Sequence, residues 1–445
     1  MTITVPQARL ILKSVMAGLR NNLASADLID WETHSAEMND RNGFLVSEQV
    51  GPEYVITETE GAVKDLSGGV QDTVFGSQSF TLNKVFGLSL GASDIESITD
   101  LGAARKARAL NNGIARLASK IDYHIFETAV KAFPFSTGTW GTALDDPDEV
   151  ATARTRLAEA SIESDMGITG VLTHADRQGL AKYIYNDNAS LASEGSRAMR
   201  RGYAGMLAGI PQKTSNQLGR ITAGTRTNGT VAGANQNVNY ADVADSGNNA
   251  GYYLTQTFNV AGLGAGGTVK AGEIFSITSG TAVYGFDPEI GENRPYQQQF
   301  VVVADATADT AGAATLRIFP AMIIGDGTTS TGSGGVNNAH RTVSNAPDNG
   351  ATVTFLGTAS TTYTPRLMFQ KDAIVAHSAP LIMPYTGQGF RRSLADAERD
   401  GQAPLMPRLW LFSDPLTGAH KARIDVFVQA QARDRWKGVK FFGTA

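Results

Sequence analysis

The chain has 445 residues, of which 38 are Lys or Arg and 43 are Asp or Glu, so its net charge is only −5. This length allows two or three domains, and a hydrophobic content of 42% argues against wholesale disorder. The near balance of charge argues against a dedicated nucleic-acid binder, and the absence of cysteine excludes disulfides and thiolate metal sites. No stretch reaches the roughly 20 apolar residues of a membrane span, and the N-terminus lacks the order of a signal peptide, so we expect a soluble protein made in the cytoplasm, with no membrane partner.

Residues 1–45 are predicted to form an N-terminal arm that begins with a helix over residues 1–30. Apolar residues recur there at helical spacing: Leu10, Ile11, Val15, Leu19 and Leu23. A single thin apolar stripe cannot form a core by itself, so the arm is expected to need a partner surface. An acidic stretch, Asp27 to Asp40, follows the helix.

Residues 46–95 are predicted to form a long β-hairpin. Its outgoing strand is EYVITETE (53–60) and its return segment is SFTLNKVFGLSLG (79–91). The return segment has the period of a strand with one covered face, because five apolar residues share one parity: Phe80, Leu82, Phe86, Leu88 and Leu90. An isolated hairpin is marginal in water, so this one is expected to lie on a neighbouring surface.

Residues from about 100 to 132 are predicted to form one long helix, capped by Asp100 and stopped by Pro134. One face is apolar: Leu110, Ile114, Leu117, Ile121 and Ile125. The opposite face is basic: Arg105, Arg108, Arg116 and Lys120. Two interpretations of this basic stripe stay open, a solvated face with some salt bridges between subunits, and a face that contacts DNA phosphates independently of base sequence.

Residues 146–218 alternate between helix and strand, which is typical of a small α/β core. The predicted helices are DPDEVATARTRLAEASIE (146–163) and HADRQGLAKYIYND (174–187), and the strand GITGVLT (167–173) lies between them. These elements predict a compact α/β domain.

Residues 219–362 are predicted to form an inserted β-rich module, a small barrel or sandwich, because a glycine excess concentrates there. Its strand candidates are YYLTQTFNV (252–260), EIFSITSG (273–280), QQFVVVADA (298–306), TLRIFPAMII (315–324) and ATVTFLG (351–357). Residues 325–350 are expected to be a flexible surface loop. After the module, one strand is predicted over residues 366–381 and one long strand over residues 424–431.

Motifs for catalysis and metal binding are weak. The stretch GLSLG (87–91) matches a nucleophile elbow around Ser89, but an elbow needs a helix directly after it, and none is predicted there. The stretch GLGAGG (262–267) matches G-x-G-x-x-G, yet a strand-like segment follows it, which indicates a turn. No catalytic, cofactor-binding or metal-binding residue is predicted, since the six histidines show no metal-binding spacing: His34, His124, His174, His340, His377 and His420.

The order of elements resembles the major capsid protein fold of tailed bacteriophages: arm, long hairpin, single long helix, α/β domain, β-rich insertion and return strands. Four stretches resemble the subgroup with an inserted β-barrel, typified by the coat protein of a Salmonella podophage. They are GYAGMLAGIPQKTSNQL (202–218), VKAGEIFSITSG (269–280), LMFQKDAIVAHSAPLI (367–382) and RIDVFVQAQARDRWKGVKFFG (423–443).

The resemblance implies an α+β fold with six parts. They are an N-terminal arm (1–45), an E-loop hairpin (46–95), a spine helix with part of the P-domain (96–145), the first part of the A-domain (146–218), the β-barrel insertion domain (219–362), and the A-domain return with the C-terminal P-domain strands (363–445).

The function that the resemblance implies is self-assembly, as hexamers and pentamers, into an icosahedral head shell that encloses phage double-stranded DNA, with no cofactor and no enzyme activity. Assembly would take place in the bacterial cytoplasm, around a scaffolding protein and with a portal protein, before maturation of the procapsid. The acidic stretch from Asp27 would bind the basic end of the scaffolding protein. Asp242 and Asp245 would reach across a two-fold axis of the shell to a basic partner. Lys64 is a candidate for the covalent crosslink between lysine and asparagine that some such shells form.

Two alternatives stay open at this point. One is the shell protein of an encapsulin-type nanocompartment, which shares the fold. The other, remote, is a serine hydrolase that uses Ser89.

Overall fold

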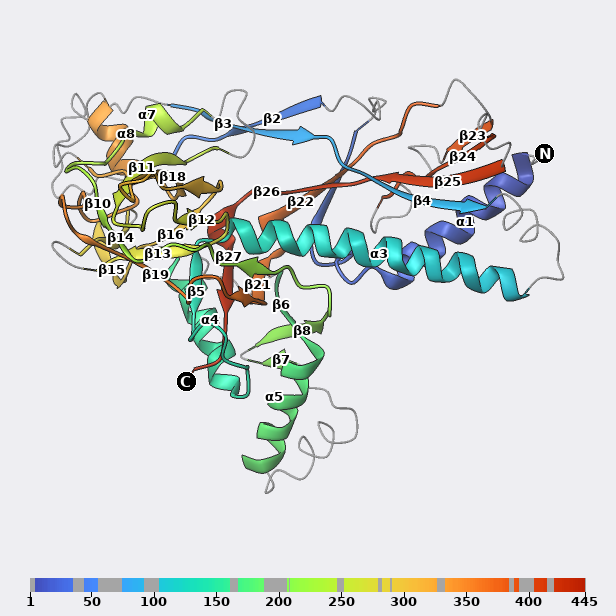
Figure 1. Ribbon diagram of the computed structural model, residues 1–445, viewed down its shortest axis with the longest axis horizontal. Helices are drawn as coiled ribbons and strands as arrows, with labels where there is room; N and C mark the ends of the chain where they lie inside the picture. Colours follow the sequence, from blue (N-terminus) through green and yellow to red (C-terminus); the bar gives the residue numbers. More distant parts are fainter. Residues whose placement is uncertain are drawn as a thin grey trace, which may run out of the picture.

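The computed structural model describes residues 5–34, 44–54, 74–91, 104–160, 167–187, 206–207, 209–245, 252–278, 282–288, 290–325, 333–383, 388–391, 404–413 and 420–444. Figure 1 shows an elongated molecule in which one long helix follows the long axis, a β-barrel lies at one end, and an α/β unit projects to the side. The predicted α+β class is confirmed. Among the described helices, none combines the length and the apolarity that crossing a membrane requires.

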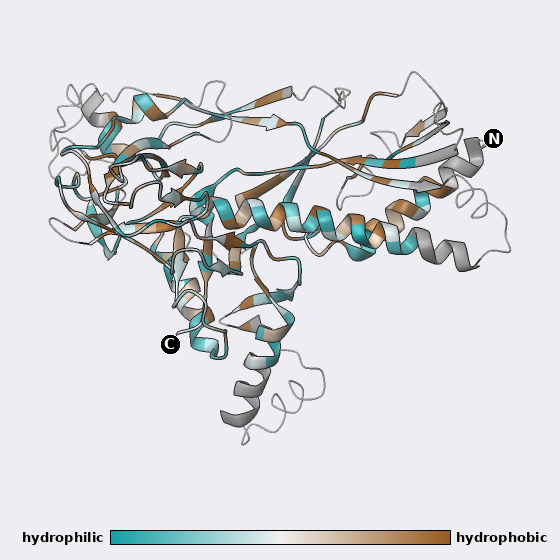
Figure 2. Cartoon of the chain, viewed as in Figure 1, coloured by the Kyte–Doolittle hydropathy of each residue, from teal (hydrophilic) through white to brown (hydrophobic). Residues whose placement is uncertain are grey.

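Helix α3 (Ala104–Ala132) is the long predicted helix, with 29 residues. It ends just before Pro134, as predicted, whereas Asp100 lies outside the described residues. The predicted apolar face is confirmed, because these side chains are buried: Ile114, Leu117, Ile121 and Ile125. Figure 2 shows hydrophobic and hydrophilic residues alternating along α3, as an amphipathic helix requires.

Helix α1 (Val5–Asn22) is shorter than the helix predicted over residues 1–30, and it is covered by its own chain. Ile11, Val15 and Leu19 are buried in the same core as Ile114 of α3. The two helices approach closely at Gly18, where a Cβ atom would lie only 2.9 Å from Cγ2 of Ile114. The partner surface that this arm was expected to need is therefore supplied, for the described helix α1, by α3 of the same chain.

The turn that follows α1 is fixed by one carboxylate of α3. Asp122 is buried and accepts hydrogen bonds from the backbone N–H groups of Ala24, at 2.9 Å, and Ser25, at 3.1 Å. The hydroxyl of Ser25 also donates to Asp122, at 2.5 Å. A buried carboxylate that accepts three hydrogen bonds stabilises a single backbone conformation of the donor segment. Asp122 therefore fixes the direction that the chain takes after α1.

Two sheets lie along α3 and involve both ends of the chain. The four-stranded sheet has the order β23 (Gln388–Arg391), β24 (Arg408–Ser413), β25 (His420–Phe427) and β4 (Val85–Gly91). The three-stranded sheet has the order β1 (Asp30–Thr33), β22 (Ile374–Ser378) and β26 (Gln429–Ala432).

Two predicted single strands are each divided between two sheets. The strand predicted over residues 424–431 changes sheet between β25 and β26, at Val428. The strand predicted over residues 366–381 is divided by a 3-10 turn (Lys371–Ala373) into β21 and β22. A run of alternating or apolar residues continues through a change of partner strand, so the pattern alone does not reveal the division.

A six-stranded sheet forms the core of the projecting α/β unit. Its order is β5 (Phe135–Thr137), β27 (Gly438–Phe441), β21 (Arg366–Gln370), β6 (Ile168–Leu172), β8 (Ile210–Thr214) and β7 (Met206–Leu207). Helix α4 (Pro147–Glu159) starts at a capping box formed by Asp146 and Glu149, and α5 (His174–Asp187) follows β6. The predicted helices and strand of residues 146–187 are confirmed, although α4 ends at Glu159.

The inserted module contains a closed six-stranded barrel. Its order is β10 (Gly229–Val231), β11 (Gln256–Ala261), β18 (Ala314–Phe319), β16 (Gln299–Val302), β13 (Ile274–Ile277) and β19 (Thr352–Phe355). All five predicted strands are present, and β10 escaped prediction because three residues are too few to show a period. The loop expected over residues 325–350 is wrong in part, because it contains α8 (Ser333–Ala339) and the buried Val343.

Shorter elements complete the described chain. They are the ribbons β9 (Ile221–Thr222) with β20 (Thr362–Tyr363), β12 (Thr268–Val269) with β17 (Ala306–Thr307) and β14 (Tyr284–Asp287) with β15 (Glu292–Gln297), helix α7 (Tyr240–Val243), and the 3-10 turn Arg435–Lys437.

A single buried lysine joins the barrel, the six-stranded sheet and α3. The ammonium of Lys440, on β27, donates to the carbonyl of Val130 in α3 at 2.8 Å and to the carbonyl of Gly272 in the barrel at 2.9 Å. Complete burial lowers the pKa of Lys440 well below its usual value. The carbonyls near a helix C-terminus carry partial negative charge, which compensates part of this desolvation.

Replacement of Ile114 by Ala should lower the free energy of unfolding by about 2–5 kcal/mol, because it removes a fully buried side chain between α1 and α3. Replacement of the exposed Arg116 by Ala, on the same helix, should change it by less than about 0.5 kcal/mol. Denaturant unfolding of the monomeric chain measures both. A loss below about 1 kcal/mol for the Ile114 variant would show that the α1–α3 core is not tightly packed.

Candidate functional site

The most extended feature is a two-stranded ribbon of β2 (Phe44–Val50) and β3 (Gly76–Leu82). The strands are antiparallel and pair from Phe44 opposite Leu82 to Val50 opposite Gly76. A hairpin is therefore present, with residues 44–50 as the strand that pairs with 76–82. Of the predicted outgoing strand, residues 53–54 are not in a strand, and residues 55–60 lie outside the described part. Its predicted return segment is two strands, β3 here and β4 in the four-stranded sheet.

The inner side of the ribbon is anchored on its own chain. Phe80 and Leu82 are buried in a small core with Phe427 and Leu381, so the base of the hairpin, which was expected to lie on a neighbouring surface, packs on a surface of its own chain. Arg433 pairs with Glu48 of β2 at 2.7 Å. The base is thus fixed by packing and by charge.

The far end of the ribbon rests on the inserted module. The hydroxyl of Ser77 donates to the carboxylate of Asp245, and the N–H of Ser77 donates to the carbonyl of Ala244 at 2.7 Å. Asp245 therefore has a partner within its own chain, whereas the prediction gave it a basic partner across a two-fold axis. Asp242 lies on α7 and is exposed, and its predicted contact with another subunit stays a prediction.

Among the described residues, the large apolar side chains that are exposed lie on two projecting features. Three belong to the ribbon or its ends: Leu45, Tyr54 and Phe75, which are 44%, 58% and 60% exposed. The others, Tyr284 and Ile290, belong to the β14–β15 ribbon of the inserted module. Exposed apolar groups on projections are typical of surfaces that bind another protein.

The basic stripe of α3 is exposed where its side chains are described. Arg116 and Lys120 are both exposed, and the ammonium of Lys120 lies 5.4 Å from the centre of the Tyr123 ring. The side chains of Arg105 and Arg108 lie outside the described part. The stripe can therefore contact a polyanion or another subunit.

The acidic stretch is engaged with bases of the same chain where it is described. Asp27 pairs with Lys213 at 3.5 Å, Asp30 pairs with Lys371 at 3.8 Å, and Glu32 pairs with Arg433. These partners reduce the negative charge that the stretch offers to a basic scaffolding segment.

His124 is buried on α3, one helical turn after Lys120 of the basic stripe. Its Nε2 accepts the N–H of Ala430 at 3.2 Å, and the ammonium of Lys84 lies 3.4 Å from Nδ1. Burial, reinforced by the nearby Lys84 charge, lowers the pKa of His124 to about 4. The packed helix residue predicted for His124 is therefore neutral near pH 7.

None of the candidate catalytic motifs forms a catalytic arrangement in the described residues. Ser89 is an exposed residue inside antiparallel strand β4, opposite Arg423, so the strand-to-helix elbow that a serine hydrolase requires is not formed there. The GLGAGG stretch is a turn, as predicted, with positive φ at Gly262, Gly264 and Gly266, and strand β12 follows it. Lys64 lies outside the described residues.

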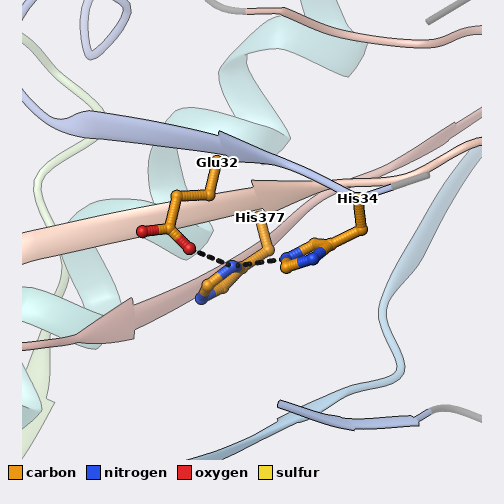
Figure 3. Close-up of side chains that lie close together, drawn as sticks. All are labelled: Glu32, His34 and His377. Atoms are coloured by element: carbon orange, nitrogen blue, oxygen red, sulfur yellow. Dashed lines mark hydrogen bonds and ion pairs between the residues drawn. The ribbon is translucent and has the colours of Figure 1, made fainter. Parts of the chain in front are cut away.

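One cluster of side chains was not foreseen from the sequence. Glu32, His34 and His377 converge between β1 and β22 (Figure 3), where Nε2 of His34 lies 3.0 Å from Nδ1 of His377. An oxygen of Glu32 lies 3.5 Å from the same Nδ1. The spacing of the histidines along the chain gave no sign of this cluster, because the parallel pairing of β1 with β22 joins residues far apart in the chain.

The chain matches one protein family and is similar in structure to several solved proteins. The family described as P22 coat protein (gene protein 5) matches residues 9–443. No curated protein matches. Among solved structures, the mature capsid of bacteriophage PhiM1 matches with 8% identity and a TM-score of 0.41, over 94% of this chain and 87% of that chain. The capsid of the cyanophage P-SCSP1u matches with 10% identity and a TM-score of 0.40, over 94% and 86%. The virus-like particle of Pyrococcus furiosus matches with 6% identity and a TM-score of 0.34, over 96% of both chains.

The family match alone carries the assignment, since TM-scores below 0.5 carry no argument. The chain is a phage major capsid protein, a structural subunit of a shell, with the tailed-phage capsid fold and an inserted barrel. It belongs to the P22 coat protein family over nearly its whole length. The predicted family and subgroup are confirmed.

Replacement of His124 by Gln should reduce the loss of stability on acidification from about pH 7 to about pH 5. The unfolded chain binds a proton at this histidine near pH 6.5, whereas the native chain does so only near pH 4, so His124 contributes stability above pH 6.5 that is lost as the pH falls through this window. The loss is about 1.4 kcal/mol for each pH unit within the window.

Urea unfolding of the monomeric chain at both pH values tests this expectation. Gln at this position still presents an oxygen to the N–H of Ala430, so the variant should fold. Replacement of the exposed His174 by Gln is the matched control and should leave the pH dependence as in the unmodified chain. Equal pH dependence in both variants and the unmodified chain would contradict the expectation.

Proposed function

We propose that this coat protein assembles as hexamers and pentamers into the icosahedral head shell that encloses phage double-stranded DNA. The observation that carries the proposal is the pair of projecting ribbons with exposed apolar side chains, at β2–β3 and β14–β15. An isolated chain leaves these groups in water, whereas a neighbouring subunit would cover them. Many modest interfaces of this kind, repeated by closed symmetry, sum to a stable shell.

Assembly is proposed to occur in the bacterial cytoplasm around a scaffolding protein, with a portal protein at one vertex. Since Asp27, Asp30 and Glu32 are already paired within the chain, an acidic docking surface for the scaffolding protein is weaker than the sequence suggested. The exposed residues Arg116 and Lys120 are proposed to face the packaged DNA. Phosphates would be their ligands, independently of base sequence. No catalytic role is proposed, and no observation favours the nanocompartment alternative.

Replacement of Leu45 and Phe75 together by Ser should abolish shell formation and leave the folded monomer intact. Both side chains are largely exposed in the single chain, so the free energy of unfolding should change by less than about 0.5 kcal/mol for each. Sedimentation and negative-stain microscopy measure assembly, and thermal unfolding measures the monomer.

Thr81, which lies opposite Leu45 on the ribbon, provides the matched control. The substitution Thr81→Ser keeps the exposed polar group and should leave shells unchanged. A normal shell yield from the Leu45 and Phe75 variant would remove the proposed role of the ribbon surface.

Replacement of Arg116 and Lys120 together by Ala should leave empty shells at normal yield and lower the yield of DNA-filled particles. Exposed charges contribute little to folding, so monomer unfolding should be unchanged. The exposed Arg220, which is not part of α3, serves as control when replaced by Ala. Loss of the empty shells themselves would instead assign the stripe to contacts between subunits, and normal yields of both particles would leave it without either role.

A further inference from the structure

The cluster of Glu32, His34 and His377 has the composition and spacing of a cation site. Three ligand atoms, one from each side chain, all lie within 4.8 Å of one another. The two measured separations, 3.0 Å between the imidazoles and 3.5 Å from His377 to Glu32, bracket the value of about 3.4 Å that a tetrahedral ion with bonds of about 2.1 Å imposes on its ligands.

Hydrogen bonds alone leave this cluster incompletely satisfied. Nδ1 of His377 faces both Nε2 of His34 and a carboxylate oxygen of Glu32, as Figure 3 shows. A neutral imidazole can donate from only one of its nitrogens, so one proton on Nδ1 cannot serve both neighbours. If Nδ1 carries the proton, the N–H can be directed at only one of the two neighbours, and if Nδ1 instead accepts from Nε2–H of His34, its lone pair faces the carboxylate oxygen of Glu32.

The position of His377 is set by its surroundings. Its side chain is fully buried, and Nε2, which is not the nitrogen that faces Glu32 and His34, has no hydrogen-bond partner within the described part of the chain. The ring is nevertheless held in place by strand pairing, since His377 lies opposite Glu32 in the parallel pair of β1 and β22. The N–H of His34 also donates to the carbonyl of Ser378 at 2.9 Å. The backbone therefore presents all three side chains to one point.

The second carboxylate oxygen of Glu32 is held from outside the cluster. Arg433 donates to it and also to Glu48 of the ribbon. A cation ligand that is oriented by a further hydrogen bond is the usual arrangement at protein metal sites. Glu32 can thus turn one oxygen to an ion and the other to Arg433.

We propose that Glu32, His34 and His377 bind one divalent transition-metal cation, of the zinc class, with water or an anion at the fourth position. Two imidazoles and one carboxylate favour Zn²⁺, Ni²⁺ or Co²⁺ over Mg²⁺ and Ca²⁺, which prefer oxygen ligands. The ion joins the segment after α1 to β22, and through Glu32 and Arg433 it reaches the base of the β2–β3 ribbon. It is a structural clamp between the arm and the centre of the subunit.

Isothermal titration of the chelator-stripped, full-length monomer with Zn²⁺ tests the proposal, with His34→Gln as the principal variant. His34 is partly exposed, so this variant should fold, and His377→Gln serves as a second one. The unmodified chain should bind one Zn²⁺ with saturation, and each variant should bind more than about tenfold more weakly. His174→Gln, on the exposed side of α5, should bind as the unmodified chain does.

Two further measurements, of thermal unfolding and of visible absorption, complete the experiment. Zn²⁺ should raise the melting temperature of the unmodified chain and of the His174 variant but not of the His34 variant, because an ion that binds only the native state stabilises it. Co²⁺ should give visible absorption bands of a tetrahedral site that the His34 variant lacks. Absence of saturable Zn²⁺ binding, or binding that survives in His34→Gln, would overturn the proposal.

Discussion

The architecture depends on the burial of one face of helix α3. A helix of 29 residues with an apolar stripe along its length cannot be covered by its own sequence neighbours, so distant segments must cover it. Helix α1 supplies part of the cover, and residues of β24, β25 and β26 share the same core. The first and last parts of the chain therefore lie at the centre of the subunit. The two ribbons and the barrel lie further out and are not needed to cover α3.

The residues that stabilise the fold of the subunit are therefore different from the residues that are left for contacts with neighbouring subunits. The described cores of the subunit are closed within one chain, including the small core under the base of the β2–β3 ribbon. Surface that is left for neighbours is concentrated on projections, where Phe75 and Ile290 are 60% and 73% exposed. Each contact with a neighbouring subunit that covers these groups would bury apolar surface.

Local patterns in the sequence predicted most of the elements but not their partners. The stripe of α3 and five of the six barrel strands carry strong periods, so they were predicted. The covering of Ile11 and Val15 by α3 was not, because an amphipathic helix does not reveal which surface buries its apolar face. The division at Val428 also escaped prediction, since alternation continues while the partner strand changes.

The candidate site was even harder to predict, because its residues come together only through the pairing of distant strands. His34 and His377 are 343 positions apart, and their contact depends on the parallel register of β1 and β22, which leaves no mark on either segment. Conversely, the GLSLG and GLGAGG matches were visible in the sequence but correspond to a plain strand and a turn. Motifs identify chemistry only when the surrounding elements have the required geometry.

The position of Lys440 has a mechanical consequence for the inserted barrel. An ammonium buried between the carbonyls of Val130 and Gly272 loses its compensation if either carbonyl moves away by more than a hydrogen-bond length. These two hydrogen bonds therefore oppose movement of the inserted module relative to the end of α3. Bending between these two parts of the subunit would leave a buried ammonium without an acceptor, which is costly in free energy.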